Sequence, residues 1–163
     1  MTKSPFGGWS MCESAFNLIL STLKDGSTLL ELGSGNVTFE LCKHYTVYSV
    51  EHNSKFIGKC PHSTYIHAPL VDEWYDVEIL KKCLPVDYEF ICVDGPPTYA
   101  RRLNMLKHLD LFKRVPMLVD DCKVKHDPNL AKSLADKFQL TVEFISTVDC
   151  QGYDHFYSLL LPN

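Results

Sequence analysis

The residues LLELGSGNVTFEL, from Leu29 to Leu41, combine an apolar run, a single acid, two glycines and a helix-like segment. The acid is Glu31, and Gly33 and Gly35 separate the apolar run from the segment that follows. This order is typical of a nucleotide-binding strand, loop and helix. The stretch therefore predicts a strand that ends in a ligand-binding turn, and the rest of the chain decides which nucleotide fits.

Similar apolar segments lie on both sides of this stretch and alternate with helix-like segments. The first five predicted strands are mostly short and non-alternating, as expected for parallel strands buried on both faces. The last two are joined by a link too short for a crossover helix, which predicts an antiparallel hairpin at the sheet edge. The predicted strands are residues 28–32, 46–51, 64–67, 88–94, 116–120, 140–147 and 155–161.

This alternation predicts an α/β fold with a doubly wound, Rossmann-like, seven-stranded sheet. We expect the sheet to be mostly parallel, with an antiparallel last strand and helices on both faces. The first helix is predicted to begin at a capping box of Ser10 and Glu13 and to stop at Asp25 and Gly26. The other helices are predicted at 37–43, 73–83, 100–112 and 128–138. In the segment 100–112, one apolar helical face predicts core packing by Leu103, Leu106, Leu109 and Phe112.

Size and charge are those of a globular protein. The 163 residues are 45% hydrophobic, which suits a single domain over residues 1–163. The net charge of −4 disfavours bulk binding to nucleic acid or to anionic membranes. The sequence shows neither the roughly 18 apolar residues of a membrane span nor the apolar core of a signal peptide. The seven cysteines show no C-x-x-C spacing, so we expect reduced thiols in a cytoplasmic protein and no zinc site at Cys60 and His62.

The glycine pattern excludes the commonest nucleotide loops. A dinucleotide fold calls for a third glycine where this chain has Thr38, and no Lys-Ser/Thr pair follows the glycines as it would in a P-loop. What remains is an E-x-G-x-G pattern of Glu31, Gly33 and Gly35. Glu51 ends the next strand, eighteen residues past Gly33, where a carboxylate accepts the two hydroxyls of a ribose.

Acids mark four of the five parallel strand ends. Glu31, Glu51 and Asp94 end three strands, and the pair Asp120-Asp121 ends a fourth. In a doubly wound sheet the ligand binds beyond the carboxyl ends of the strands. Because a structural sheet has no need of acids there, this clustering indicates function, with solvated strand ends as the alternative.

Taken in order, these motifs resemble the class I S-adenosylmethionine-dependent methyltransferases over nearly the whole chain. The resemblance rests on Glu31-x-Gly33-x-Gly35, on Glu51 and on FICVDGPP, which is similar to the fourth-strand motif of that family. The segments HAPLVDEWYD, VDGPPTYARR and LVDDC are closer still to a bacterial branch of small methyltransferase-like proteins.

The resemblance implies S-adenosyl-L-methionine as the cofactor. Gly33 and Gly35 would let the backbone approach its methionine part, and Glu31 would orient the loop or meet its amino group. Glu51 would hold the ribose. His52 would lie against the adenine, with a surface histidine as the alternative, and Ala68 would border the adenine edge. The implied cofactor residues are Glu31, Gly33, Ser34, Gly35, Glu51, His52, Ala68 and Asp94.

Three of the acids suggest a divalent cation. Asp94, Asp120 and Asp121 should meet at one rim, where like charges repel unless they are protonated or neutralised. Hard oxygen ligands favour Mg²⁺ and similar ions, and the pattern also resembles the metal-dependent catechol-type O-methyltransferases. The alternative is that Asp94 meets cofactor or water, while Asp120 and Asp121 cap a loop and a helix.

The chain departs from the catechol-type pattern in one respect. Those enzymes carry a lysine base shortly after the fourth-strand acid, whereas this chain continues with Gly95-Pro96-Pro97. The substitute bases are His126, Lys123 and Asp94 itself, with an exposed loop residue as the alternative for His126.

Further residues near the strand-four acid lack a definite role. Arginine forks suit carboxylates and phosphates, so Arg101 or Arg102 is a candidate for binding an acidic substrate. The alternative is two solvated residues at the start of a helix. Trp9, before the first helix, either covers the cofactor or forms a hydrophobic staple.

The leading hypothesis is O-methylation of a small-molecule or carbohydrate hydroxyl. The alternative from another class is a catalytically inactive, cofactor-binding module of a larger assembly. A methyltransferase for nucleic acid or protein is disfavoured by the charge of −4 and by the lack of an N-P-P-Y-type motif. Thr38 and the lack of a second catalytic half disfavour a nicotinamide-dependent reductase. A homodimer would help so short a chain to enclose its substrate.

Overall fold

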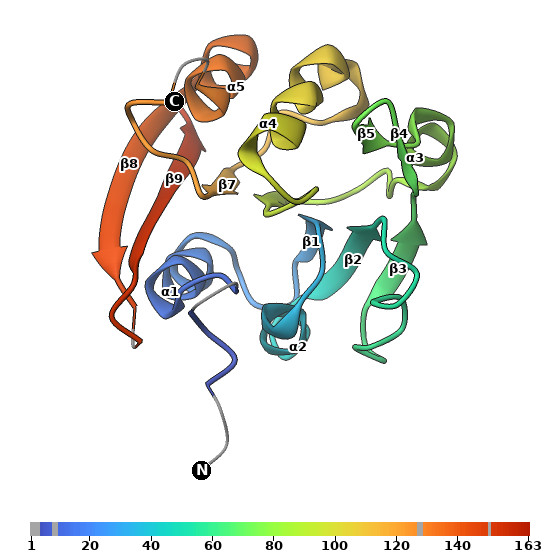
Figure 1. The fold of residues 1–163 in the computed structure, drawn as a ribbon, viewed down its shortest axis with the longest axis horizontal. Helices are drawn as coiled ribbons and strands as arrows, with labels where there is room; N and C mark the ends of the chain where they lie inside the picture. The colour runs from blue at the N-terminus through green and yellow to red at the C-terminus, as the bar shows by residue number, and fades with distance from the viewer. Residues whose placement is uncertain (1–3, 8–9, 127–128, 150) are drawn as a thin grey trace.

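The computed structural model describes residues 4–7, 10–126, 129–149 and 151–163 (Figure 1). Seven strands form one sheet in the order β3-β2-β1-β6-β7-β9-β8. All seven predicted strands are confirmed, with ends that differ by two residues at most. The strands are β1 (Thr28–Leu32), β2 (Thr46–Glu51), β3 (Thr64–His67), β6 (Phe90–Val93), β7 (Met117–Asp120), β8 (Leu140–Val148) and β9 (Asp154–Pro162).

The predicted doubly wound sheet is also confirmed. Strands β3, β2, β1, β6 and β7 are parallel, whereas β9 pairs antiparallel with both β7 and β8. The chain order runs outward to β3 on one side of β1 and outward to β7 on the other. The order therefore reverses between β1 and β6, and such a switch point opens a crevice at the carboxyl ends of the strands.

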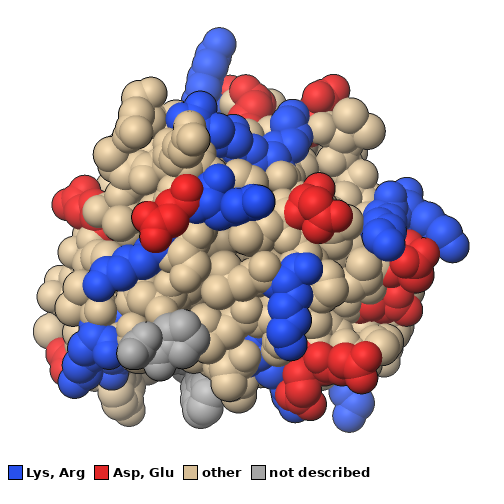
Figure 2. Space-filling model, turned by 90° about the horizontal axis from the view of Figure 1, so that it is seen from above, with Lys and Arg blue, Asp and Glu red and all other residues tan. Residues whose placement is uncertain are grey.

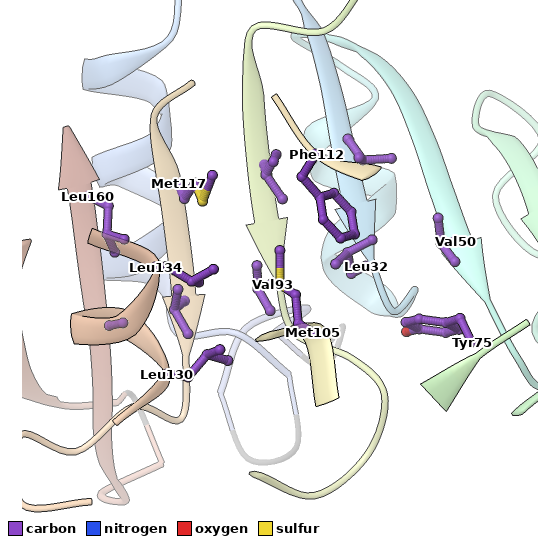
Figure 3. Packing of buried hydrophobic residues seen from close by; sticks show 14 of the residues in the cluster. Leu32, Val50, Tyr75, Val93, Met105, Phe112, Met117, Leu130, Leu134 and Leu160 are labelled. Carbon is purple, nitrogen blue, oxygen red and sulfur yellow. The ribbon is translucent and has the colours of Figure 1, made fainter. Parts of the chain in front are cut away.

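Helices cover both faces of the sheet, as predicted (Figure 1). One buried cluster packs α1 and α2 against one face, and a second cluster lies under α3, α4 and α5 on the other face (Figure 3). In the described residues, no helix is both long enough and apolar enough to span a membrane. The helices are α1 (Glu13–Thr22), α2 (Asn36–Leu41), α3 (Val77–Cys83), α4 (Tyr99–Arg102) and α5 (Leu130–Phe138).

The prediction for the start of α1 is wrong. The helix begins at Glu13 with Cys12 as its N-cap, and no side chain caps it. The backbone N–H of Ser10 instead donates to the carbonyl of Gly7 at 3.2 Å, so Ser10 belongs to a preceding turn. The helix also ends at Thr22, before the predicted stop. Trp9, for which we predicted a cover or a staple, and Cys150 lie outside the described residues.

The predicted helix over 100–112 is divided. Only α4 is α-helical, and two 3₁₀ segments follow, η1 (Leu103–Lys107) and η2 (Leu109–Leu111). The predicted apolar residues recur every third position, which matches the three residues per turn of a 3₁₀ helix better than the 3.6 of an α-helix. Their core packing is confirmed: Phe112 is buried, and Leu103, Leu106 and Leu109 pack against the same cluster (Figure 3).

A small hairpin was missed by the sequence analysis. Strands β4 (Leu70–Val71) and β5 (Trp74–Tyr75) pair antiparallel, and α3 begins only after them, at Val77 rather than at residue 73. Asp76 caps α3, because its side chain accepts hydrogen bonds from the N–H groups of Glu78 and Ile79. The hairpin lies beside the carboxyl ends of β1 and β2 and so becomes part of the site (Figure 3).

Substitutions at two glycines can distinguish the cost of backbone strain from the cost of a steric clash. Gly26 and Gly33 both have positive φ, +85° and +89°, where a side chain is strained. A Cβ at Gly26 would meet nothing within 4 Å, whereas a Cβ at Gly33 would lie 3.0 Å from the backbone of Gly95. We expect Gly26→Ala to lower the free energy of unfolding by about 1 kcal/mol and Gly33→Ala to lower it further. Urea denaturation measures both free energies of unfolding. Equal losses would show that a methyl group at Gly33 does not clash with Gly95.

Candidate cofactor and acceptor site

The candidate site lies at the switch point, where the loop after β1 meets the loop after β6. Gly33 and Gly95 touch there, since a Cβ on Gly95 would be 2.7 Å from the Cα of Gly33. Glu51 stands at the end of β2 on one side, and Asp94 and Asp120 stand at the ends of β6 and β7 on the other. The strand topology therefore brings the predicted acids to one edge of the sheet.

Glu31 organises the glycine loop from inside the protein. It is 4% exposed, and its carboxyl accepts hydrogen bonds from the hydroxyls of Thr38, at 2.9 and 3.0 Å, and Ser49, at 2.6 Å. The Thr38 hydroxyl in turn accepts the N–H of Gly35 at 2.9 Å. These bonds support the first of the two roles that the resemblance implies, orientation of the loop. Thr38, which replaces a third glycine, thus connects the acid to the loop.

The surroundings of Glu31 change its protonation. Burial raises the pKa of Glu31 to about 7, although hydrogen bonds from Ser49 and Thr38 oppose the shift. Near neutral pH, a large share of this carboxyl group therefore holds a proton. An uncharged Glu31 can donate that proton to a neighbouring oxygen and so remain buried at a lower cost than a carboxylate.

Glu51 binds the same loop from the other side. Its Oε2 accepts hydrogen bonds from the backbone N–H and the hydroxyl of Ser34, at 3.0 and 2.8 Å. Its Oε1 accepts the N–H of Asn53 at 2.7 Å, and Nδ1 of His52 lies 3.0 Å from it. Glu51 is 3% exposed, so it is a loop-holding acid with spare acceptor capacity rather than a solvated strand end.

The predicted adenine side lies at the ends of β2 and β3. Ala68 is fully buried, and its N–H donates to the carbonyl of Glu51 at 2.9 Å. The ring of His52 lies edge-on to the ring of Tyr75, with centroids 6.5 Å apart. Among the described residues, the buried hydroxyl of Tyr75 has no hydrogen-bond partner, whereas Nδ1 of His52 lies at ion-pair distance from Glu51. Buried polar atoms of this kind indicate a place for a polar ligand.

The three aspartates gather as predicted, but an arginine lies among them. One carboxylate oxygen each from Asp94, Asp120 and Asp121 falls within 4.8 Å of the others. Arg102, which is 5% exposed, donates to the carboxylates of Asp94 at 3.1 Å and Asp121 at 3.0 Å. Its other bonds go to the carbonyl oxygens of Asp94, Pro96 and Asp120, at 2.8, 3.3 and 3.0 Å. All five N–H donors of a guanidinium are therefore matched by an acceptor.

The acids remain crowded despite this cation. Burial, together with the charge of Asp120, raises the pKa of Asp94 well above its usual range, while Arg102 opposes the shift. Burial and the charge of Asp121 raise the pKa of Asp120 to about 6. The side chain of Asp94 is 30% exposed, so it can reach a ligand, whereas Asp120 is 3% exposed.

Arg102 bears on the predicted Mg²⁺ site. Arg102 bonds one carboxylate oxygen each of Asp94 and Asp121, and a buried oxygen of Asp120 has no described partner. A divalent ion among these carboxylates would be repelled by the guanidinium. The three carboxylates could hold a metal ion only beside this guanidinium, and a magnesium role stays a prediction.

The candidate basic residues contact groups of the protein itself. Arg102 bonds internal groups, so its predicted role in substrate binding is replaced by a positioning role. Arg101 pairs with Glu73 at the tip of the β4–β5 hairpin. Nδ1 of His126 accepts the N–H of Lys123 at 3.2 Å, and its ring lies 4.2 Å from that of Tyr99. Burial and Lys123 lower the pKa of His126, and its role as a base stays a prediction.

Two residues of this site were not predicted from the sequence. Tyr75 lies in the hairpin that shows no clear periodicity, although its position within HAPLVDEWYD gave a signal through the resemblance. Thr38 stood out only as a departure from the dinucleotide pattern. Tyr75 reaches the site because the hairpin packs against the strand ends. Thr38 belongs to the site because its hydroxyl bonds Glu31.

Comparison of the sequence with protein-family models and with curated proteins finds no match. Solved structures do match. A magnesium protoporphyrin IX methyltransferase from Synechocystis with bound SAM is 13% identical, with a TM-score of 0.60 over 91% of this chain and 76% of that one. An O-methyltransferase from Bacillus cereus in complex with SAH is 13% identical, with a TM-score of 0.59 over 96% and 84%.

A dimethyladenosine transferase from Plasmodium falciparum also matches. It is 14% identical with a TM-score of 0.55, and this chain covers 61% of its length. At such low sequence identities, the similarity to these structures establishes the fold alone. The chain therefore has the Rossmann-like α/β fold of the class I S-adenosylmethionine-dependent methyltransferases, as the sequence motifs predicted.

The raised pKa of Glu31 makes a prediction for stability. The folded protein holds this proton up to about pH 7, whereas the unfolded chain releases it near 4.5. Between these values the native state binds more protons, so Glu31 lowers the free energy of unfolding as pH rises. The shift corresponds to about 3 kcal/mol. We expect Glu31→Gln to gain up to about 3 kcal/mol relative to the unmodified protein between pH 4 and pH 8.

Urea denaturation at several pH values measures this difference. Glu143→Gln is the matched control, because it makes the same substitution at an exposed position on β8 and should not reproduce the gain of Glu31→Gln. A difference between Glu31→Gln and the unmodified protein that does not change with pH would show that folding leaves the protonation of Glu31 unchanged.

Proposed function

We propose that this chain is an S-adenosylmethionine-dependent O-methyltransferase for a small-molecule or carbohydrate hydroxyl. One observation carries the proposal: at the switch point, a glycine loop bonded to Glu51 lies directly beside the acid Asp94. Glu51 and the loop offer a place for a nucleoside, and Asp94 stands where an acceptor would approach. The solved relatives described above include structures with SAM and with SAH, which supports this choice of cofactor.

The loop has room for the cofactor at Gly35. A Cβ there would meet nothing within 4 Å, and the backbone of Gly35 has an extended φ of −167°. Ser34, Gly35 and the free acceptor capacity of Glu51 would face the ribose and methionine parts. His52, whose Nδ1 faces Glu51, would present its ring to the adenine beside Ala68.

The chain's own residues would position the acceptor and take its proton. The bound cofactor supplies an electrophilic methyl group on a sulfonium. Transfer of that methyl group to the acceptor oxygen would leave the carbon–sulfur electron pair on sulfur, and a base of this chain would take the hydroxyl proton. Asp94 is the first candidate base, because its side chain is partly exposed at the acceptor side of the site. His126 is the second.

In this proposal Arg102 takes the place that a metal would fill. Its bonds to Asp94 and Asp121 hold both carboxylates in place and balance part of their charge. Removal of Arg102 would leave buried acids unpaired, which is strongly destabilising.

Several other readings compete with this one. A domain that binds the cofactor without turnover would show the same affinity but release no SAH in the presence of hydroxyl acceptors. For a nucleic-acid acceptor we would expect a basic surface, yet acidic and basic side chains are interspersed on the face with α3, α4 and α5 (Figure 2). A homodimer, as a further proposal, would enclose an acceptor above the exposed edge of the site.

Gly35 gives a clean test of the cofactor proposal. In the free protein Gly35→Ala should fold with unchanged stability, because the added methyl group meets open space. If the cofactor lies against this loop, the methyl group would occupy its place, and affinity for S-adenosyl-L-homocysteine should fall at least tenfold. Isothermal titration calorimetry measures the affinity. Gly26→Ala, remote from the site, is the control that should bind normally. Unchanged binding by Gly35→Ala would remove this placement.

Mg²⁺ gives a second test. Because Arg102 already bonds Asp94 and Asp121, we expect Mg²⁺ to leave the affinity for S-adenosyl-L-homocysteine unchanged in the same titrations. A rise in affinity with Mg²⁺ that Asp121→Asn abolishes would instead support the metal-assisted mechanism and contradict the role given to Arg102.

A further inference from the structure

The β4–β5 hairpin places an aromatic side chain in the middle of the proposed cofactor site. Tyr75 is fully buried, and a Cβ on Gly95 would collide with its hydroxyl. Gly33 adjoins Gly95 at the same point. Figure 3 shows the Tyr75 ring across the ends of β1 and β2, with its oxygen on the side that faces β6. The phenol therefore fills the space between the Glu51 half and the Asp94 half of the site.

The Tyr75 phenol lies among polar and charged groups but forms no hydrogen bond with the described residues. Its hydroxyl has no hydrogen-bond partner among the described residues, although a buried hydroxyl normally finds one. The charges of Glu51, Asp94 and Arg102 all act on it. The indole N–H of Trp74, whose ring centroid is 5.1 Å from that of Tyr75, is buried and lacks a described partner as well. The Tyr75 hydroxyl and the Trp74 N–H are thus two buried donors on one hairpin whose hydrogen-bonding capacity is unused, which is energetically costly.

The hairpin is strained at its tip and fastened from outside. Asp72 and Glu73 have φ values of 50° and 65°, in the left-handed region that glycine and asparagine favour. Glu73 forms an ion pair with Arg101 of α4, which holds the tip down. At the base, the N–H of Asp76 donates to the carbonyl of Pro69 at 2.9 Å. The tip is thus held by an exposed ion pair, whereas Trp74 and Tyr75 on the second strand are buried in the core cluster. Outward movement of the hairpin would therefore have to expose both rings.

We propose that Tyr75 occupies the cofactor's place in the free protein, and that the β4–β5 hairpin swings outward to admit the cofactor. Tyr75 is then an affinity-determining residue of the site, and the Glu73–Arg101 pair sets how often the hairpin opens. The inference rests on the proposed function, because it names what the cofactor displaces.

Binding kinetics test the opening step. Trp74 reports on the hairpin by fluorescence, and a Trp9→Phe background leaves it as the single tryptophan of the two in the sequence. In stopped-flow mixing with S-adenosyl-L-homocysteine, the observed rate should level off at high ligand concentration, because opening precedes binding. Glu73→Gln should raise that plateau several-fold, since it removes the ion pair at the tip.

Glu78→Gln is the matched control for Glu73→Gln. It removes a similarly exposed ion pair, Glu78–Lys81, on α3, and should leave the plateau unchanged. Tyr75→Ala should bind S-adenosyl-L-homocysteine about tenfold more tightly in calorimetry, because the ligand no longer displaces the phenol. Loss of a buried aromatic weakens the fold, so the exposed Glu73→Gln variant decides the matter if Tyr75→Ala does not fold.

The outcomes separate this inference from the proposed function. If the unmodified protein binds with a rate that rises linearly, and neither Glu73→Gln nor Tyr75→Ala binds faster or more tightly, the hairpin proposal is overturned and the proposed function stands. If the unmodified protein, Glu73→Gln and Tyr75→Ala all fail to bind, the proposed function fails, and the inference that rests on it fails too.

Discussion

The buried guanidinium of Arg102 is the interaction on which the site depends. It joins the end of β6, the turn at Pro96 and the end of β7 through carbonyl oxygens, and it also binds two of the three clustered carboxylates. Without this cation the acids would repel one another in a poorly solvated place. The geometry of the acceptor side therefore follows from one side chain that α4 delivers to the sheet edge.

The cofactor side has a different chemistry. There the glycine loop is held between two glutamates, one below it and one beside it. Glu31 reaches the loop through Thr38, while Glu51 bonds Ser34 directly. Because Glu31 is buried and can stay protonated, it supports the loop without adding a full negative charge beneath the ligand. Glu51 retains acceptor capacity for the ligand itself. Because their environments differ, Glu31 supports the loop, whereas Glu51 also has acceptor capacity for the ligand.

Much of the fold could be predicted because the signals are local. The apolar runs of the strands, the short link before β9 and the acids at the strand ends are all legible in the sequence, and the structure confirms each of them. The hairpin could not be predicted in the same way. Its strands have two residues each, and its turn at Asp72 and Glu73 contains no glycine, so neither periodicity nor turn chemistry marks it.

Neighbouring residues with the same chemistry were the other difficulty. Arg101 and Arg102 are indistinguishable in sequence, yet one lies among the acids and the other at the surface. The direction in which each side chain leaves α4 decides this, and that direction depends on a helix of four residues between two irregular segments. In the same way, Ser10 fits a capping box, but a preceding turn takes up its backbone N–H.

The position of β9 has a consequence for synthesis on the ribosome. This strand comes after all the others in the chain, yet it lies inside the sheet between β7 and β8. Until it emerges, β7 has an open hydrogen-bonding edge and β8 has no partner strand to join. A nascent chain that has completed the proposed cofactor loops therefore still exposes an unpaired sheet edge, which makes it vulnerable to aggregation until β9 emerges.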